Sequence, residues 1–312
     1  MAAASVNEIN REKYVEELAM DGVDEVPHQY INNHPTAAND IKESLPLMDL
    51  PVVDFTRLIT SSQLEKELEK LREALSSWGC FHIINHGMES VIDKMRKDAR
   101  QFFQLPMDEK LKRYGKDNVA LDQTQAEDWT DRIFLIVTPK DQRKMNLWPQ
   151  NPHSFRKTLH EYTEGVTRII ETLVKFAAKA LGLPENFFFE INFYPPCPKP
   201  ELVFGLKQHT DGSVMTLVLP DEEVEGFHFH KDGQMVLSNG IFKSVYRAVT
   251  NKENGRMSIA LFWSPEREKW IGPIDELISE KRPKLYKIAK NYTEIVYEAY
   301  RKGTSALEAM KL

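Results

Sequence analysis

His209 and Asp211 are the residues of this chain whose types and spacing point most directly to chemistry. Only Thr210 separates them, and residues two apart on a strand project to the same side. An imidazole nitrogen and a carboxylate oxygen can therefore converge on one divalent cation, and iron is the metal that we expect. So short a motif also occurs in ordinary surface turns, so the rest of the sequence must decide.

Arg256 and Ser258 form a second pair with the same spacing, on a later apolar run that is typical of a strand. A guanidinium and a hydroxyl on one face suit the carboxylate of a small dicarboxylic acid, because arginine binds carboxylates with two parallel hydrogen bonds. The phenol of Tyr194, which precedes a proline-rich turn, can add a third hydrogen bond. The plainer alternative is a surface arginine, a strand serine and a turn.

The bulk properties exclude several classes of protein. The chain has 312 residues, a net charge of -6 and two cysteines. An acidic balance argues against nucleic-acid binding, which needs a surplus of lysine and arginine. Two cysteines exclude a disulfide framework and favour a reducing compartment. The sequence shows neither a membrane-spanning run of about 20 apolar residues nor a signal-peptide pattern, so we expect a cytoplasmic monomer without a membrane partner.

The elements that must position these residues follow a simple order of helices, then a β-rich half, then helices again. Residues 1–45 are predicted to be a polar N-terminal arm, and 46–185 a helical region with strands near 50–55, 80–84 and 133–137. Apolar residues at helical spacing predict helices over about 62–77, 89–104 and 154–181. Residues 186–305 hold short strand-like runs, then a helix at about 281–301, and 306–312 form a C-terminal tail.

In this order the motifs resemble one known family. Asn192-Phe193-Tyr194-Pro195-Pro196-Cys197, His209-Thr210-Asp211 and Arg256-Met257-Ser258 are similar to the signatures of the plant 2-oxoglutarate- and Fe(II)-dependent dioxygenases. Upstream, 50–55 and 78–87 resemble the N-terminal signatures of that family, as do 181–184 and 237–245 further along. The resemblance covers about 45–300.

The resemblance implies a mixed α+β protein with a double-stranded β-helix, or jelly-roll, core and flanking helices. It implies iron at His209 and Asp211, and 2-oxoglutarate held by Arg256, Ser258 and Tyr194, with Asn192 nearby. The implied reaction converts 2-oxoglutarate and O2 to succinate and CO2 while a small molecule of plant specialised metabolism is hydroxylated or O-demethylated. Ascorbate would keep the iron reduced.

The chain departs from the family pattern at the second histidine ligand. The family has this histidine directly before an arginine, whereas here the text runs Ser244-Val245-Tyr246-Arg247. The histidine looks skipped rather than substituted, and losing one residue from a strand reverses the side to which the following residues point. The chain also looks shortened between Gln234 and Met235, before Tyr114 and before Ile191, so we expect an incomplete jelly-roll core.

These departures leave alternatives open. His228 or His230 could swing toward the metal, or Tyr246 could offer its phenolic oxygen, although two half-exposed strand histidines are the plainer interpretation. The main alternative to an active dioxygenase is a catalytically impaired or inactive relative, from a splice variant or a decayed paralogue, without a complete iron triad. A metal-binding protein that uses His228 or His230 for other chemistry is a third hypothesis. Trp129, Asp131 and Arg132 are candidates for a substrate pocket.

Overall fold

The structure is a computed structural model that describes residues 13–32, 49–60, 62–111, 126–177, 186–229, 246–273, 275, 278–302, 304 and 306–312. Its helices are α1 (Val15–Met20), α3 (Phe55–Ile59), α4 (Leu64–Glu73), α5 (Glu89–Phe103), α6 (Met107–Leu111), α7 (Phe155–Ala177), α8 (Tyr292–Arg301) and α9 (Ala306–Met310). Its strands are β1 (Val52–Asp54), β2 (His82–Ile84), β3 (Asp131–Thr138), β4 (Asn186–Tyr194), β5 (Leu206–His209), β6 (Met215–Leu219), β7 (Phe227–Phe229), β8 (Tyr246–Ala248) and β9 (Arg256–Ser264).

A four-stranded antiparallel sheet in the order β3-β4-β9-β6 is the centre of the fold. Alternate residues of its strands point to opposite faces. In β9, Met257, Ile259 and Leu261 belong to the main hydrophobic core, so Arg256 and Ser258 point to the other face. This alternation separates a packing face from a face that can carry chemistry.

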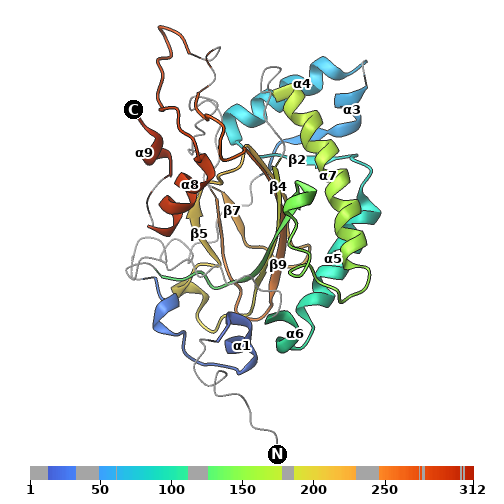
Figure 1. The fold of residues 1–312 in the computed structure, drawn as a ribbon, viewed down its shortest axis with the longest axis vertical. Coiled ribbons are helices and arrows are strands. Elements are labelled where there is room, and N and C mark those ends of the chain that lie inside the picture. Colours follow the sequence, from blue (N-terminus) through green and yellow to red (C-terminus); the bar gives the residue numbers. More distant parts are fainter. Residues whose placement is uncertain are drawn as a thin grey trace, which may run out of the picture.

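Two long helices cover the packing face. In Figure 1, α5 and α7 run along the same side of the sheet, beside β4 and β9. Their apolar stripes share one core with the sheet: Phe102, Leu159, Ile170 and Leu173 are at most 1% exposed. The long helix predicted over 154–181 is confirmed as α7 over its described residues, 155–177.

A second, three-stranded antiparallel sheet has the order β5-β8-β7. In Figure 1 its strands β5 and β7 lie alongside the larger sheet, on the side away from α5 and α7. The fold is thus mixed helix and sheet, as predicted. The predicted shortening between Gln234 and Met235 lies outside the described residues.

The N-terminal segment was predicted to be a polar arm, but its described part, 13–32, is packed against the protein. Val15, Val26 and Tyr30 are at most 6% exposed and pack in one cluster with Trp129. A buried ion pair joins Glu16 to Lys110 at 2.5 Å. The side chains of Val15, Val26 and Tyr30 anchor the segment to the protein. The number of polar residues in the segment does not reveal this anchoring.

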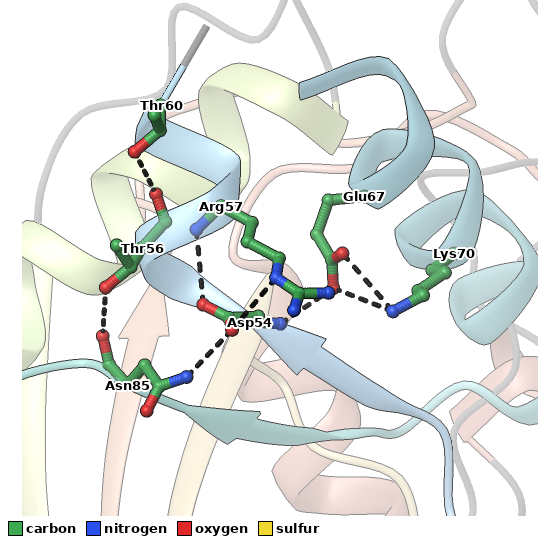
Figure 2. Close-up of polar contacts among 7 residues, drawn as sticks. All are labelled: Asp54, Thr56, Arg57, Thr60, Glu67, Lys70 and Asn85. Atoms are coloured by element: carbon green, nitrogen blue, oxygen red, sulfur yellow. Dashed lines mark hydrogen bonds and ion pairs between the residues drawn. The ribbon is translucent and has the colours of Figure 1, made fainter. Parts of the chain in front are cut away.

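Polar contacts around Asp54 join the first strand pair to the helices that follow it (Figure 2). The Asp54 carboxylate accepts hydrogen bonds from the Arg57 backbone N–H at 3.2 Å and from Asn85 Nδ2 at 2.7 Å. The first bond caps α3 at its N-terminus. Glu67 of α4 accepts the Asp54 backbone N–H at 2.8 Å. These bonds fix β1, β2 and α4 as one unit.

The first of the two C-terminal helices begins later than the sequence predicted. A helix was expected over about 281–301, but α8 begins at Tyr292. Before it, Ile271 and Ala289 form a β-bridge, and Asn291 has a φ of 55°, which a helix cannot contain. The predicted C-terminal tail contains α9, and Met310 is fully buried against Tyr286.

Within the described residues, every helix is too short or too polar to cross a membrane.

Candidate active site

His209 and Asp211 lie together where the smaller sheet meets the larger one. His209 ends β5, and Asp211 follows in the turn that leads to β6. His209 Nε2 and Asp211 Oδ1 are 3.6 Å apart, and their side chains are 16% and 10% exposed. The two candidate ligands therefore converge as the spacing predicted. Among the described residues, these two belong to no group of three histidine, cysteine or acidic side chains that could hold a metal.

A hydrogen bond fixes the proton of His209 on the nitrogen that faces away from Asp211. Nδ1 lies 2.7 Å from the backbone carbonyl oxygen of Lys207. A carbonyl oxygen only accepts, so neutral His209 must donate from Nδ1. The lone pair of the neutral ring is then on Nε2, toward Asp211. A backbone partner of this kind commonly orients histidine ligands of metals.

Asp211 is buried and held by a hydroxyl pair. Thr216 Oγ1 donates to Asp211 Oδ2, and Ser213 Oγ lies 2.7 Å from Thr216 Oγ1. Burial raises the pKa of Asp211 to about 6, although His209 and the Thr216 bond favour the carboxylate. A buried carboxylate of this kind is stabilised by a cation, so the site suits a positive ion.

Arg256 is a buried guanidinium with free hydrogen-bond donors. It is 2% exposed, and its Nε and Nη1 atoms have no hydrogen-bond partner among the residues that the structure describes. The guanidinium carbon lies 4.8 Å from the centre of the Tyr194 ring. Leaving a buried donor unsatisfied costs about 1–3 kcal/mol, and more for a charged group. A carboxylate that enters the site would satisfy these donors with two hydrogen bonds.

Strand register brings the other predicted cosubstrate residues to Arg256. Tyr194 is the cross-strand partner of Arg256, and Asn192 is the partner of Ser258. The Tyr194 phenol makes hydrogen bonds with Ser258 and Arg256, while burial raises its pKa to about 12. Asn192 is 3% exposed, and its Oδ1 accepts no hydrogen bond from any described residue. All four predicted residues therefore share one face of the sheet.

Tyr246 lies directly opposite His209. The two residues are partners across β5 and β8, and their ring centres are 4.8 Å apart. Between this pair and the pair of Leu206 with Ala248, β5 spans one residue more than β8, so the ladder contains a bulge. In space, Tyr246 therefore occupies the position facing His209, whereas the sequence suggested that this position had been skipped. The bulge takes up the register change.

The register also separates His228 from the metal pair. His228 pairs with Arg247, while Tyr246 pairs with Phe229 and His209. Neighbouring positions in a ladder point to opposite faces. His228 therefore faces away from the side shared by His209 and Tyr246, while burial and the charges of Arg247 and Arg256 lower its pKa. The other substitute considered, His230, lies outside the described residues.

The sequence analysis missed several polar residues beside the metal pair. Tyr300 of α8 contacts the His209 ring edge-on, with centres 5.2 Å apart, and donates its hydroxyl to Asp128. Figure 1 shows α8 beside β5. Burial lowers the pKa of the Arg132 guanidinium, but nearby negative charges, including those of Glu190 and Asp128, raise this pKa overall. The residues that the sequence analysis missed, Asp128, Glu190 and Tyr300, come from three separated segments, so no local spacing marks them.

Two of the three pocket candidates have structural roles instead. Trp129 is fully buried and donates to the Pro195 carbonyl oxygen at 3.2 Å. Asp131 accepts the backbone N–H of Glu16 at 2.7 Å. Of the three, only Arg132 faces the site, because it points to the opposite side of β3 from Asp131. Cys197 is buried, and burial raises the pKa of its thiol to about 11, which disfavours the thiolate form that nucleophilic chemistry needs.

Two family profiles match this architecture. The N-terminal profile of the non-haem dioxygenases in morphine synthesis covers residues 50–151, and that of the 2OG-Fe(II) oxygenase superfamily covers 186–265. The second match spans β4 to β9 and contains all of the described candidate ligands. The chain belongs to the 2-oxoglutarate- and Fe(II)-dependent oxygenases.

Individual relatives agree with this assignment along nearly the whole chain. Codeine O-demethylase of Papaver somniferum is 32% identical over 96% of this chain and 95% of its own. Oxoglutarate-dependent flavonoid 7-O-demethylase 1 of Ocimum basilicum is 32% identical over 96% of this chain and 90% of its own. A crystal structure of JOX2 in complex with 2OG, Fe and JA superposes with a TM-score of 0.81, at 26% identity over 97% of this chain and 98% of that one.

Membership in this family makes the protein an oxidoreductase with a jelly-roll core that uses Fe(II) and 2-oxoglutarate. The residues of this structure fit the cosubstrate, because the unsatisfied donors of Arg256 match a carboxylate. They fit the metal at two positions, His209 and Asp211. Nothing in the comparisons favours an inactive relative over an active enzyme.

Proposed function

We propose that His209 and Asp211 bind the iron of this dioxygenase and that Arg256 and Ser258 bind the far carboxylate of 2-oxoglutarate. The buried guanidinium of Arg256 carries this proposal. Its free Nε and Nη1 atoms lie in the same part of the sheet as Ser258 and Tyr194, whose hydroxyls can complete the set of donors. Asn192, two residues before Tyr194 on β4, adds a buried polar group.

The chain's own residues contribute orientation and exclusion of water. When bound, iron and 2-oxoglutarate would supply the oxidising chemistry, in which the substrate, O2 and 2-oxoglutarate are converted to the oxidised product, succinate and CO2. His209 presents Nε2 because Lys207 holds the Nδ1 proton. Thr216 holds Asp211 Oδ2 in place, and burial of Arg256 strengthens its hydrogen bonds to the cosubstrate.

For the substrate, we propose a small molecule of plant specialised metabolism that is hydroxylated or O-demethylated. The similar proteins from Papaver somniferum include a thebaine 6-O-demethylase as well as the codeine O-demethylase. In this chain, Arg132, Glu190 and Tyr300 surround the metal pair with charge and an aromatic ring. We also propose that the enzyme acts as a cytoplasmic monomer with ascorbate as its reductant.

An anaerobic titration tests the proposed site. Purified protein receives Fe(II) and then 2-oxoglutarate, and the visible charge-transfer band of the bound complex is recorded before O2 is admitted and succinate is measured. We expect the band and slow succinate formation without a substrate. A panel of O-methylated and unmethylated alkaloids and flavonoids then separates formaldehyde release from hydroxylation. Absence of both the band and succinate would refute the proposed function.

A further inference from the structure

Tyr246 has a buried hydroxyl that none of the described residues satisfies. Its phenolic oxygen is shielded from solvent and has no hydrogen-bond partner in that part of the chain. Leaving such a group unpaired costs about 1–3 kcal/mol. Native proteins leave few buried polar atoms without a partner, and binding of an ion is a recognised explanation for the exceptions.

The surroundings of Tyr246 show where such an ion would lie. Its ring is placed between His209, with centres 4.8 Å apart, and Phe227, with centres 5.6 Å apart. The register of β5 with β8 places it on the same face as His209. Its hydroxyl is therefore an unpaired oxygen donor on the face of the sheet that carries His209.

Other side chains near the metal pair are less suitable. His228 points to the opposite face of the sheet. Glu190 influences Asp211 electrostatically, but it forms no metal-binding group with His209 and Asp211. The hydroxyl of Tyr300, the second tyrosine on the His209 ring, is already bonded to Asp128.

We propose that Tyr246 is the third protein ligand of the iron, through its phenolic oxygen. The metal would then be held by one imidazole, one carboxylate and one phenolate. This proposal rests on the proposed function, since it takes the ion at His209 and Asp211 to be iron. Tyrosine oxygen is an established iron ligand in other proteins. A second anionic oxygen favours Fe(III) over Fe(II), so this site depends strongly on a reductant.

Metal titration without 2-oxoglutarate tests the proposal directly. The full-length wild type, Y246F, Y246H and Y300F are titrated anaerobically with Fe(II), then exposed to O2 while the visible spectrum is recorded. Wild type should show the charge-transfer absorption of Fe(III) phenolate, the phenol having released its proton to solvent. Y246F should lose this band and bind Fe(II) at least about 10-fold more weakly, because even outer-shell partners of metal ligands contribute that much.

The two remaining variants are controls. One removes the hydroxyl of the other tyrosine beside His209, and the other tests whether the protein still folds and binds iron with a different ligand at position 246. Y300F removes a hydroxyl from the other tyrosine on His209, so it should keep the visible band. Y246H should bind Fe(II) as tightly as wild type, without the band and with slower oxidation to Fe(III). Because Tyr246 already faces His209, this substitution needs no insertion and leaves the strand register unchanged.

Several results would overturn the proposal. A wild type that binds no iron, or that binds it without the visible band, removes Tyr246 from the ligand set. Y246F that binds Fe(II) as tightly as wild type does the same. Iron that binds wild type without the visible band, or that binds Y246F equally well, refutes only the role of Tyr246, whereas a wild type that binds no iron also refutes iron binding at His209 and Asp211. A protein with the band but without 2-oxoglutarate binding refutes only the proposed function.

Discussion

Arg256 is the residue at which function and stability oppose each other most clearly. Its guanidinium is buried with two unsatisfied nitrogens, and the Tyr194 ring is its neighbour. Without a ligand, this arrangement costs free energy, and proteins commonly retain such costs at functional sites. Binding of a carboxylate would remove the cost, so 2-oxoglutarate should stabilise the folded protein.

We predict that Arg256→Met weakens 2-oxoglutarate binding about 100-fold or more, as expected for losing charge-assisted hydrogen bonds worth about 3 kcal/mol. Calorimetry of the Fe(II) form measures the affinity. Thermal unfolding should show that saturating 2-oxoglutarate raises the Tm of wild type but not of the variant. Arg143→Met, a change at an arginine of another region that contacts Trp148, should leave 2-oxoglutarate affinity unaltered. Equal affinities of wild type and Arg256→Met would contradict the assigned role.

Thr216 acts on the metal through Asp211, whose Oδ2 accepts its hydroxyl. We predict that Thr216→Val, which is nearly isosteric, lowers Fe(II) affinity about 10- to 100-fold by freeing the carboxylate to rotate. Ser213→Ala is the matched control, because Ser213 contacts Thr216 and leaves the Asp211 bond in place. A larger loss in the Ser213 variant than in the Thr216 variant would show that this bond does not orient Asp211.

At the scale of elements, the first turn of α1 rests on the Asp131 carboxylate of β3. The carboxylate accepts the backbone N–H groups of Val15 at 3.3 Å and Glu16 at 2.7 Å. Burial nevertheless raises its pKa to about 7, against an ordinary value of 3.8. Between these pH values the folded protein binds more protons than the unfolded chain, so this group's contribution to stability falls as the pH rises.

We predict that Asp131→Asn removes this dependence on pH. In urea unfolding between pH 4.5 and 7.5, wild type should lose stability relative to the variant, by up to about 1.4 kcal/mol per pH unit. Glu65→Gln, a change at an exposed carboxylate on α4, should follow the slope of wild type. Parallel curves for wild type and Asp131→Asn would show that Asp131 does not titrate in this range.

At the scale of the whole molecule, the N-terminal and C-terminal segments of the described chain pack against the elements that carry the candidate site. The N-terminal segment packs against Trp129, next to the strand that carries Arg132. The C-terminal α9 packs under α8, whose Tyr300 contacts His209. The site therefore depends on segments that the family signatures do not include.

We predict that Met310→Ala lowers the free energy of unfolding by about 2–5 kcal/mol, because it empties a fully buried position in the cluster that holds α8. Denaturant unfolding measures the change. Leu312→Ala, two residues later and 77% exposed, should change stability by less than about 0.5 kcal/mol. Equal effects of the two substitutions would show that α9 does not support the fold.

The sequence by itself determined the features that depend on local geometry. The two-residue alternation of a strand placed Arg256 and Ser258 on one face. His209 and Asp211 also lie together, although Asp211 is in the turn just beyond the end of β5. Helical periodicity located α5 and α7 to within a few residues over their described lengths. These predictions held because side-chain direction within one element follows from backbone geometry alone.

Only the tertiary structure decided how distant segments meet. The β5–β8 bulge put Tyr246 opposite His209, although the text around Tyr246 suggested a missing position. The same ladder turned His228 away, and α8 brought Tyr300 to the His209 ring. Cross-strand register depends on pairing and bulges between segments far apart in the chain. For that physical reason, the sequence identified the pair His209 and Asp211, whereas it left Tyr246 as one of three candidates beside His228 and His230.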